Sequence, residues 1–354
     1  MKKFVALLLA VLLLSASVTA FAEGPQIARA HTIAAGNDIS FGIRCDGKII
    51  IKGGLHDASY SQKDVKQWND IVSLSAGPSH IVGLKSNGRV VAAAESNAST
   101  LCAVNDWVDI VAVVAGSDIT IGLKDDGTVI TTKEGYLEDW FKIVDIDAGR
   151  WQTVGLRSDG KVVAEGKNEN GECDVENWRD IVAIAAGSWH TVGLKADGTV
   201  VATGGNVVDE CKVDSWKNIV AIDAGQRFTV GLRSDGTVMA VGDNSDGQCN
   251  VSDWTDIVAI SAGDKHVIGL MSDGTVVATG KNVHSECSLG GWSDITMPQD
   301  LPDWLYSYEL TFGCEFETGP GSAAKTLPGF ILSKLLTLAY RLCYTSKDRF
   351  LSRY

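Results

Sequence analysis

Basic residues are scarce in this sequence. Lys and Arg number 31 against 44 Asp and Glu, which gives a net charge of −13, and no local cluster of basic residues offsets the excess. A surface this acidic repels phosphate backbones and anionic membranes. The charge balance therefore argues against nucleic acid as a partner.

Signatures of common catalytic and metal sites are also missing. The sequence contains no H-E-x-x-H motif, no G-x-S-x-G motif and no glycine-rich phosphate loop. The segment Asp243 to Gly247 lacks the alternating ligand spacing of a calcium loop and is interpreted as a turn. We therefore predict no catalytic residue, no metal site and no cofactor.

Three histidines (His80, His190 and His266) share one position of the repeat described below, which indicates hydrogen-bonding core residues. The other three, His31, His56 and His284, are isolated.

Long apolar runs are confined to the N-terminus. Lys2 and Lys3 precede eleven apolar residues from Phe4 to Leu14, and an A-x-A pattern at Ala20 to Ala22 follows. This is the pattern of a secretory signal peptide, and eleven residues are too few to span a bilayer. We predict that residues 1–22 are removed and that the protein is secreted by a bacterium, with no transmembrane span.

A tryptophan repeat dominates residues 23–296. The spacings between the repeated tryptophans are 39, 33, 38, 38, 38 and 38 residues. An Ala-Gly pair and a G-[IL]-x-x-[DN]-G segment each recur seven times in the same register. The repeated tryptophans are Trp68, Trp107, Trp140, Trp178, Trp216, Trp254 and Trp292.

Residues 178–215 contain one whole unit, and its turn signals predict antiparallel strands. The Asp197-Gly198 pair is a strong hairpin signal between two apolar runs. The expected strands are 181–186, 190–195, 199–203 and a shorter fourth strand at 211–213. Seven such units predict an all-β fold, a seven-bladed β-propeller of four-stranded blades. Trp292 to Thr296 repeats the opening of a unit, and we predict that it pairs with residues near 27–33 to close the ring.

The repeat D-I-V-A-I-x-A-G-x-x-H-T-V-G-L-x-x-D-G-T-V-V-A-x-G-x-N resembles the regulator of chromosome condensation repeat over roughly residues 26–296. The resemblance implies a seven-bladed propeller. The founder of that family is an exchange factor for a nuclear GTPase, a role that the acidity and the predicted export argue against. Exported bacterial members include a propeller-type beta-lactamase inhibitory protein whose loops hold another protein. The resemblance thus implies a protein-binding role, with an inhibitory one included.

The connections at one end of the predicted blades differ most between units. In an antiparallel blade the Ala-Gly loop and the later Gly-Asn loop share one end, and the near-identical Asp-Gly hairpins occupy the other. Variation on a fixed scaffold is typical of binding loops, and Trp and Arg are enriched in binding hot spots. Trp151 and Trp189 lie outside the 38-residue spacing, and an alternative is that they plug the channel or pack between blades. The predicted partner-binding residues are Asp118, Arg150, Trp151, Trp189, Arg227, Phe228, Asp264 and Lys265.

An enzyme is the second functional hypothesis, because propellers also host hydrolases and lyases. Such an enzyme would act on a glycan or peptide through carboxylates at the mouth of the channel. The abundance of Asp and Glu prevents the assignment of any particular pair.

Four cysteines recur at the repeat spacing, each five residues before its tryptophan. Positions that are equivalent by sevenfold repetition are too far apart for disulfides unless they line the channel. We favour small buried thiols, with disulfides between adjacent blades or a metal site in the channel as the alternatives. The four residues are Cys173, Cys211, Cys249 and Cys287, and Cys102 matches them across the shortened third unit.

The C-terminal residues depart from the repeat. Residues 297–321 are interpreted as a tail that packs on the propeller or as a linker. Residues 322–354 are interpreted as amphipathic or disordered, and Phe330 to Tyr344 has the pattern of a helix that contacts a membrane surface or a partner.

Overall fold

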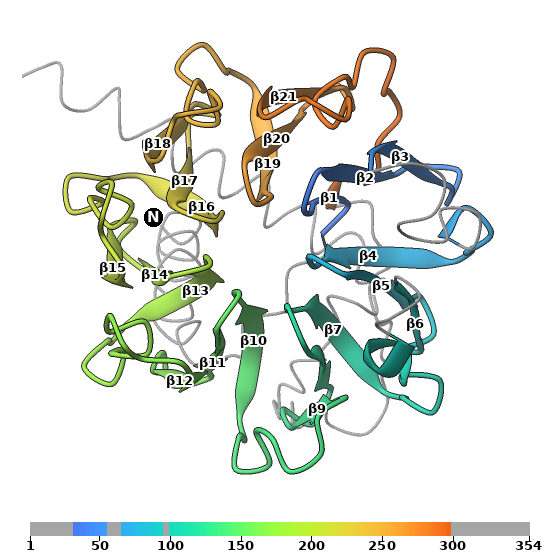
Figure 1. Ribbon diagram of the computed structural model, residues 1–354, viewed down its shortest axis with the longest axis vertical. Coiled ribbons are helices and arrows are strands. Elements are labelled where there is room, and N and C mark those ends of the chain that lie inside the picture. Colours follow the sequence, from blue (N-terminus) through green and yellow to red (C-terminus); the bar gives the residue numbers. More distant parts are fainter. Residues whose placement is uncertain (1–30, 55–64, 95–98, 299–354) are drawn as a thin grey trace, which may run out of the picture. The chain divides into compact units, whose positions relative to one another are not determined.

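The computed structural model describes residues 31–54, 65–94 and 99–298. In these ranges the strands form seven separate three-stranded antiparallel sheets, each built from strands that are consecutive in the chain (Figure 1). We number them sheets 1 to 7 in chain order. The strands are β1 (Ile33–Ala35), β2 (Ile39–Ile43) and β3 (Ile49–Gly53) in sheet 1; β4 (Ile71–Ala76), β5 (His80–Lys85) and β6 (Val90–Ala94) in sheet 2; β7 (Ile110–Ala115), β8 (Thr120–Lys124) and β9 (Val129–Thr131) in sheet 3; β10 (Ile143–Ala148), β11 (Gln152–Arg157) and β12 (Val162–Gly166) in sheet 4; β13 (Ile181–Ala186), β14 (His190–Lys195) and β15 (Val200–Gly204) in sheet 5; β16 (Ile219–Ala224), β17 (Phe228–Arg233) and β18 (Val238–Gly242) in sheet 6; β19 (Ile257–Ala262), β20 (His266–Met271) and β21 (Val276–Gly280) in sheet 7; a 3-10 helix, η2 (Ser99–Cys102), follows sheet 2.

The first strands of the seven sheets form a ring. Each first strand contacts the first strand of the next sheet, and β1 contacts both β4 and β19 (Figure 1). Among the described residues, β ladders run within the sheets and not from one sheet to the next. Neighbouring sheets are therefore joined by packing and by individual hydrogen bonds, and no continuous sheet closes the ring in these ranges.

The predicted fourth strand at 211–213 is wrong, because this segment forms consecutive turns. The amide of Lys212 donates to the carbonyl of Asp209, and that of Val213 donates to the carbonyl of Cys211. The side-chain oxygen of Asn206 accepts the amide of Cys211 at 2.9 Å. Because these donors are satisfied locally, they are not available to a β ladder.

The end of the repeat region closes on sheet 1. Ile295 forms an isolated antiparallel bridge with Arg44, just after β2. Most of the predicted partner segment 27–33 lies outside the described residues. The amide of Cys45 donates to the carbonyl of Asp294, and the amide of Thr296 donates to that of Ile43. This segment gives sheet 1 the link that the other sheets receive from the residues that directly precede them in the chain.

Each periodic tryptophan packs on the second repeat glycine. A Cβ atom added at Gly231 would lie 2.5 Å from Cζ3 of Trp216, which is 1% exposed. Trp292 makes the same contact with Gly42 of sheet 1, so a C-terminal residue completes the first unit. These contacts give the periodic tryptophans a structural role. The pairs are Trp68–Gly83, Trp107–Gly122, Trp140–Gly155, Trp178–Gly193, Trp216–Gly231, Trp254–Gly269 and Trp292–Gly42.

Several segments with sequence-based predictions lie outside the described residues. They are the predicted signal peptide at 1–22 and, apart from Met297 and Pro298, the segments 297–321 and 322–354. Within the described ranges, no helix has the length and apolar character needed to cross a membrane.

Candidate functional site

Two connections of every sheet lie at the same end of its strands. Because the strands are antiparallel, the loop between the first and second strands adjoins the residues that follow the third strand. In sheet 4 the amide of Lys167 donates to the carbonyl of Trp151 at 2.9 Å, and in sheet 5 the amide of Gly205 donates to that of Trp189 at 2.7 Å. We call this end the loop end. The Asp-Gly hairpins lie at the opposite end.

Trp151 and Trp189 form a pair at the loop end. They hold the same position in sheets 4 and 5, two residues after the glycine of the Ala-Gly pair. Their ring centroids are 5.7 Å apart, with the planes tilted by 47°. Trp151 is 43% exposed and Trp189 is half-buried, so the pair presents an aromatic surface to solvent.

Two cations flank this aromatic pair. The guanidinium of Arg150 lies 5.5 Å from the Trp151 ring centroid. The ammonium of Lys167 lies 5.4 Å from the Trp151 ring and 5.5 Å from the Trp189 ring, and it pairs with Glu169 at 3.0 Å. Cations over indole rings are attracted by the ring quadrupole. We call Arg150, Trp151, Lys167 and Trp189 the aromatic–cation cluster.

Sequence reasoning missed Lys167, although a signal was present. Lys167 begins the Gly-Asn loop of its unit, and the hairpin register places that residue beside the Ala-Gly loop of the same unit. The pairing of Gln152 with Gly166 sets this register. A register argument from the Asp-Gly turn would therefore have placed Lys167 next to Trp151.

The remaining predicted site residues lie on other sheets. Asp118 and Arg227 are exposed on sheets 3 and 6, and Lys265 on sheet 7 pairs with Asp246 at 3.2 Å. Asp264 is half-buried; burial raises the pKa of its carboxyl, and Arg150 opposes this shift electrostatically. Arg150 thus acts on the loop of sheet 7 as well as on Trp151.

Phe228 is a correction to the predicted site. Its side chain is fully buried in the core of sheets 6 and 7 and cannot contact a partner. It is the first residue of β17, the position that the core histidine His190 holds in sheet 5. The repeat register alone would have assigned Phe228 to the core.

The repeated histidines link neighbouring sheets, as predicted for hydrogen-bonding core residues. Nε2 of His190 lies 2.9 Å from the hydroxyl of Thr229, which donates to the carbonyl of Glu210 at 2.7 Å. That hydroxyl has one hydrogen, which it donates to Glu210, so Nε2 is the donor in the contact with His190. The other two links are His80–Thr120 at 2.8 Å and His266–Ser40 at 2.9 Å.

Aspartates on two first strands also link neighbouring sheets. One carboxylate oxygen of Asp147 accepts the amide of Ala186 in sheet 5 at 2.7 Å, and the other accepts the amide of Ala148 at 2.8 Å. Asp223 accepts the amide of Ala262 in sheet 7 at 2.8 Å. Serine hydroxyls make the same kind of link elsewhere, from Ser75 to the amide of Ala115 and from Ser261 to the amide of Ala35.

The two aspartates have unusual acidity. Burial raises the pKa of Asp147 to about 6. Burial, followed by the negative charge of Asp147, raises the pKa of Asp223 to about 7. Raised carboxyl pKa values occur at catalytic sites, but both oxygens of each residue already accept backbone amides. We therefore interpret them as links between sheets.

The repeated cysteines are free thiols, as favoured from the sequence, although they are half-buried instead of fully buried. The Cys211 thiol donates to the carbonyl of Gly205 at 3.2 Å. Burial, with a smaller contribution from Glu210, raises the pKa of this thiol to about 12. Cys173, Cys249 and Cys287 make the same contact in sheets 4, 6 and 7.

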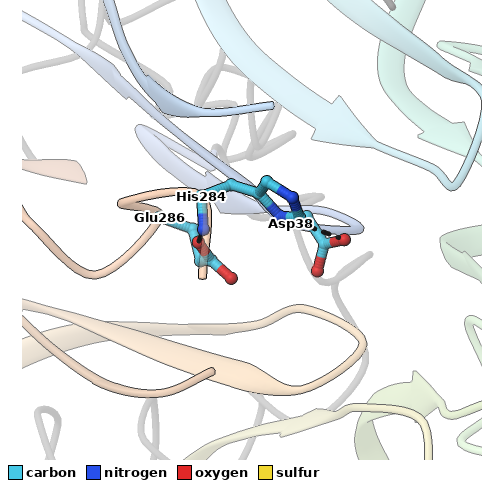
Figure 2. Close-up of side chains that lie close together, drawn as sticks. All are labelled: Asp38, His284 and Glu286. Carbon is cyan, nitrogen blue, oxygen red and sulfur yellow. Dashed lines mark hydrogen bonds and ion pairs between the residues drawn. The ribbon is translucent and has the colours of Figure 1, made fainter. Parts of the chain in front are cut away.

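A second group of chemically capable side chains joins sheets 1 and 7. Figure 2 shows the Asp38 carboxylate close to the imidazole of His284, with Glu286 beside them. One potential ligand atom from each residue lies within 4.8 Å of the other two. From the sequence, His284 is isolated and no metal site is predicted. Asp38 is far from His284 in the chain, so no local motif joins the two residues.

Three consecutive segments match the model of the Regulator of chromosome condensation (RCC1) repeat: residues 181–208, 219–248 and 257–286. They coincide with sheets 5, 6 and 7. These three segments are RCC1 repeats. Sheets 1 to 4 have the same strand order and glycine–tryptophan contacts, so the repeat structure extends beyond the matched segments. No curated protein matches the chain significantly.

Several solved propeller structures resemble this chain. The CRINKLY WD40 ectodomain of the Arabidopsis thaliana receptor kinase ACR4 matches with a TM-score of 0.56 and 16% identity over 74% of this chain and 99% of that one. Yeast RCC1 (Prp20), in a structure with Kap60 bound to it, matches with a TM-score of 0.54 and 15% identity over 78% and 87%. The receptor kinase CR4 ectodomain of Physcomitrella patens matches with a TM-score of 0.53 and 18% identity over 72% and 73%. These similarities show an RCC1-like propeller fold.

Proposed function

We propose that this protein is a secreted bacterial interaction module that binds a protein partner through its loop end. The observation that carries the proposal is the aromatic–cation cluster, in which Trp151 and Trp189 lie together with part of their surface open to solvent. Large aromatic and Arg side chains dominate the energetics of protein interfaces. Two indole rings with Arg150 and Lys167 offer a partner both apolar area and positive charge within an acidic protein.

Partner binding is also seen among the similar structures. Kap60 is bound to yeast RCC1 (Prp20) in one of them. The low identity does not carry that partner over to this chain. It supports only the use of a propeller as a surface for another protein, and inhibition of the bound protein is one outcome of such binding.

Affinity capture from the native extracellular medium tests the proposal. We expect the wild-type protein to retain a saturable partner and the Trp151→Ala and Trp189→Ala variants each to lose about 2 kcal/mol of binding free energy, roughly thirtyfold in affinity. Phe141→Ala is the matched control, because Phe141 is 53% exposed beneath Arg157 at the opposite end. If both tryptophan variants bind as well as Phe141→Ala does, the cluster is not the binding surface.

Export is tested separately. The proposal of secretion rests on the signal-peptide pattern of residues 1–22. Expression of the full chain in a bacterial host should give extracellular protein that begins at Glu23. Retention of the uncleaved chain inside the cell would contradict it and would leave the binding surface to be tested on its own.

A further inference from the structure

Sheets 4 to 7 share a glutamate or glutamine that braces the loop after the third strand. In sheet 7, an oxygen of Glu286 accepts the amide of His284 at 2.7 Å. The same contact joins Glu172 to Asn170, Glu210 to Val208 and Gln248 to Asp246 in sheets 4, 5 and 6. The hydrogen bond of one Glu286 oxygen is therefore a shared feature of the repeat.

The other oxygen of Glu286 is not explained in this way. Glu286 is completely buried, and its Oε1 has no hydrogen-bond partner among the described residues. In sheet 4 the matching oxygen of Glu172 accepts the side-chain amide of Asn170 at 2.7 Å. A buried carboxylate oxygen without a donor is costly. It points to a positively charged ligand.

Asp38 and His284 supply two more potential ligands close to Glu286. Nδ1 of His284 has no hydrogen-bond partner, and it lies 3.6 Å from Oδ2 of Asp38, beyond hydrogen-bond distance. One potential ligand atom of each of the three residues lies within 4.8 Å of the other two (Figure 2). Bonds of about 2.0–2.2 Å to a zinc ion would therefore require small rotations of these side chains.

We propose that Asp38, His284 and Glu286 form a binding site for a divalent transition-metal ion of the Zn²⁺ class. One imidazole nitrogen and two carboxylate oxygens suit zinc and its neighbours, whereas Mg²⁺ and Ca²⁺ prefer oxygen ligands alone. Three protein ligands leave a coordination position for water. The ion would tie sheet 1 to sheet 7, where the first and last repeat units meet.

The ammonium of Lys281 is a positive charge that would lie close to a bound metal ion. It lies 2.7 Å from Oδ1 of Asp38, the oxygen that does not face His284. This ion pair holds the positive charge of Lys281 next to the proposed ligand Asp38. Repulsion from Lys281 lowers the affinity of the site. Its removal is therefore expected to strengthen metal binding.

The test is calorimetric titration of the full-length protein, treated with EDTA and then dialysed free of it, with ZnCl2, and with MgCl2 as the comparison. We expect saturable binding of zinc and none of magnesium. We also expect a higher melting temperature in zinc, because a ligand that binds only the folded state stabilises it. Absence of saturable zinc binding would overturn the proposal.

Variants taken from the other repeat units separate ligation from folding. His284→Asn places the residue of sheet 4 at this position, and Glu286→Gln places that of sheet 6, so both should fold. Each is expected to lower zinc affinity by at least about tenfold. Lys281→Met should raise it, and Glu210→Gln in sheet 5 is the matched control that should leave it unchanged. Zinc binding that survives His284→Asn would assign the ion to other groups, such as the exposed thiol of Cys45, and would reject the site.

Discussion

Nε2 of His190 in sheet 5 lies 2.9 Å from the hydroxyl of Thr229 in sheet 6. Burial lowers the pKa of this imidazole to about 4. The ring is therefore neutral at pH 7 and holds two sheets together as a hydrogen-bond donor. Burial also lowers the pKa of His80 and of His266 to about 4.

The first prediction concerns the pH dependence of this link. The unfolded imidazole takes up a proton as the pH falls through about 6.5, whereas the folded one stays neutral to about 4. The stability that the neutral ring contributes is thus present above pH 6.5 and is lost between these values, at up to about 1.4 kcal/mol per pH unit. His190→Gln is the matched variant, because Gln152 holds this position in sheet 4.

Urea unfolding at pH 8, 6 and 5 measures the effect. We expect the difference in unfolding free energy between the wild type and His190→Gln to shrink as the pH falls. A difference that does not change with pH would show that His190 contributes only packing. The comparison with the variant is essential, because Asp147 and Asp223 shift stability in the opposite direction.

The turn residues and the apolar runs within each unit made its first three strands predictable. In the unit of sheet 5, two of the three observed strands have the expected bounds, and β15 (Val200–Gly204) is shifted by one residue. The Asp-Gly turn and the apolar runs determine the structure of adjacent residues, so the strands that they form can be predicted from the sequence. The prediction of a fourth strand was wrong because the side-chain oxygen of Asn206 accepts the amide of Cys211. An apolar pattern does not reveal such a side-chain hydrogen bond.

Contacts between units were harder to predict. The pairing of Trp151 with Trp189 depends on the rotation from one sheet to the next, which the spacing of 38 residues does not specify. Asp38 and His284 are 246 residues apart, and only closure of the ring brings them together. The repeat register alone would have been sufficient to assign Phe228 to the core. It is not sufficient to predict which residues meet across sheets.

A second prediction concerns the contact between glycine and tryptophan. A Cβ at Gly231 would lie 2.5 Å from the Trp216 ring, which is buried and cannot move without disturbing its neighbours. We expect Gly231→Ala to lower the unfolding free energy by about 1–3 kcal/mol, the usual effect of overpacking. Gly290→Ala is the control, because a Cβ at Gly290 would have no atom within 4 Å. Equal melting temperatures for the two variants would contradict the proposed packing role.

A third prediction concerns the link made by Asp223. Its folded pKa is raised to about 7, so the acid contributes stability that is present below its unfolded pKa of about 3.8 and is lost as the pH rises towards 7. Asp223→Ser keeps a hydroxyl acceptor, as Ser75 and Ser261 do in sheets 2 and 7, and removes the charge beside Asp147. We expect the stability of Asp223→Ser relative to the wild type to increase from pH 4 to pH 8.

Asp223→Ala completes this comparison. Alanine removes the charge and also leaves the buried amide of Ala262 without its acceptor, which costs about 1–3 kcal/mol. Asp223→Ala should therefore be less stable than Asp223→Ser at every pH. If the two variants unfold at the same urea concentration, the link between sheets 6 and 7 contributes nothing.

The last prediction concerns the reactivity of the thiols. The Cys211 thiol is half-buried, donates to a carbonyl and has a pKa raised to about 12, so almost none of it is thiolate at pH 8. Because the thiolate is the nucleophile, Cys211 should resist alkylation in the folded protein. Cys45 is exposed and should react first.

Alkylation by iodoacetamide at pH 8, followed by mass mapping of the modified peptides, measures each cysteine separately. We expect the Cys45 peptide to be labelled under native conditions and the Cys211 peptide only in denaturant, with Cys173, Cys249 and Cys287 behaving like Cys211. The Cys45→Ser variant is the control for native labelling. Rapid native labelling of Cys211 would mean that the loop after β15 opens readily, and the bond from its thiol to the Gly205 carbonyl would then contribute little to holding the loop end in place.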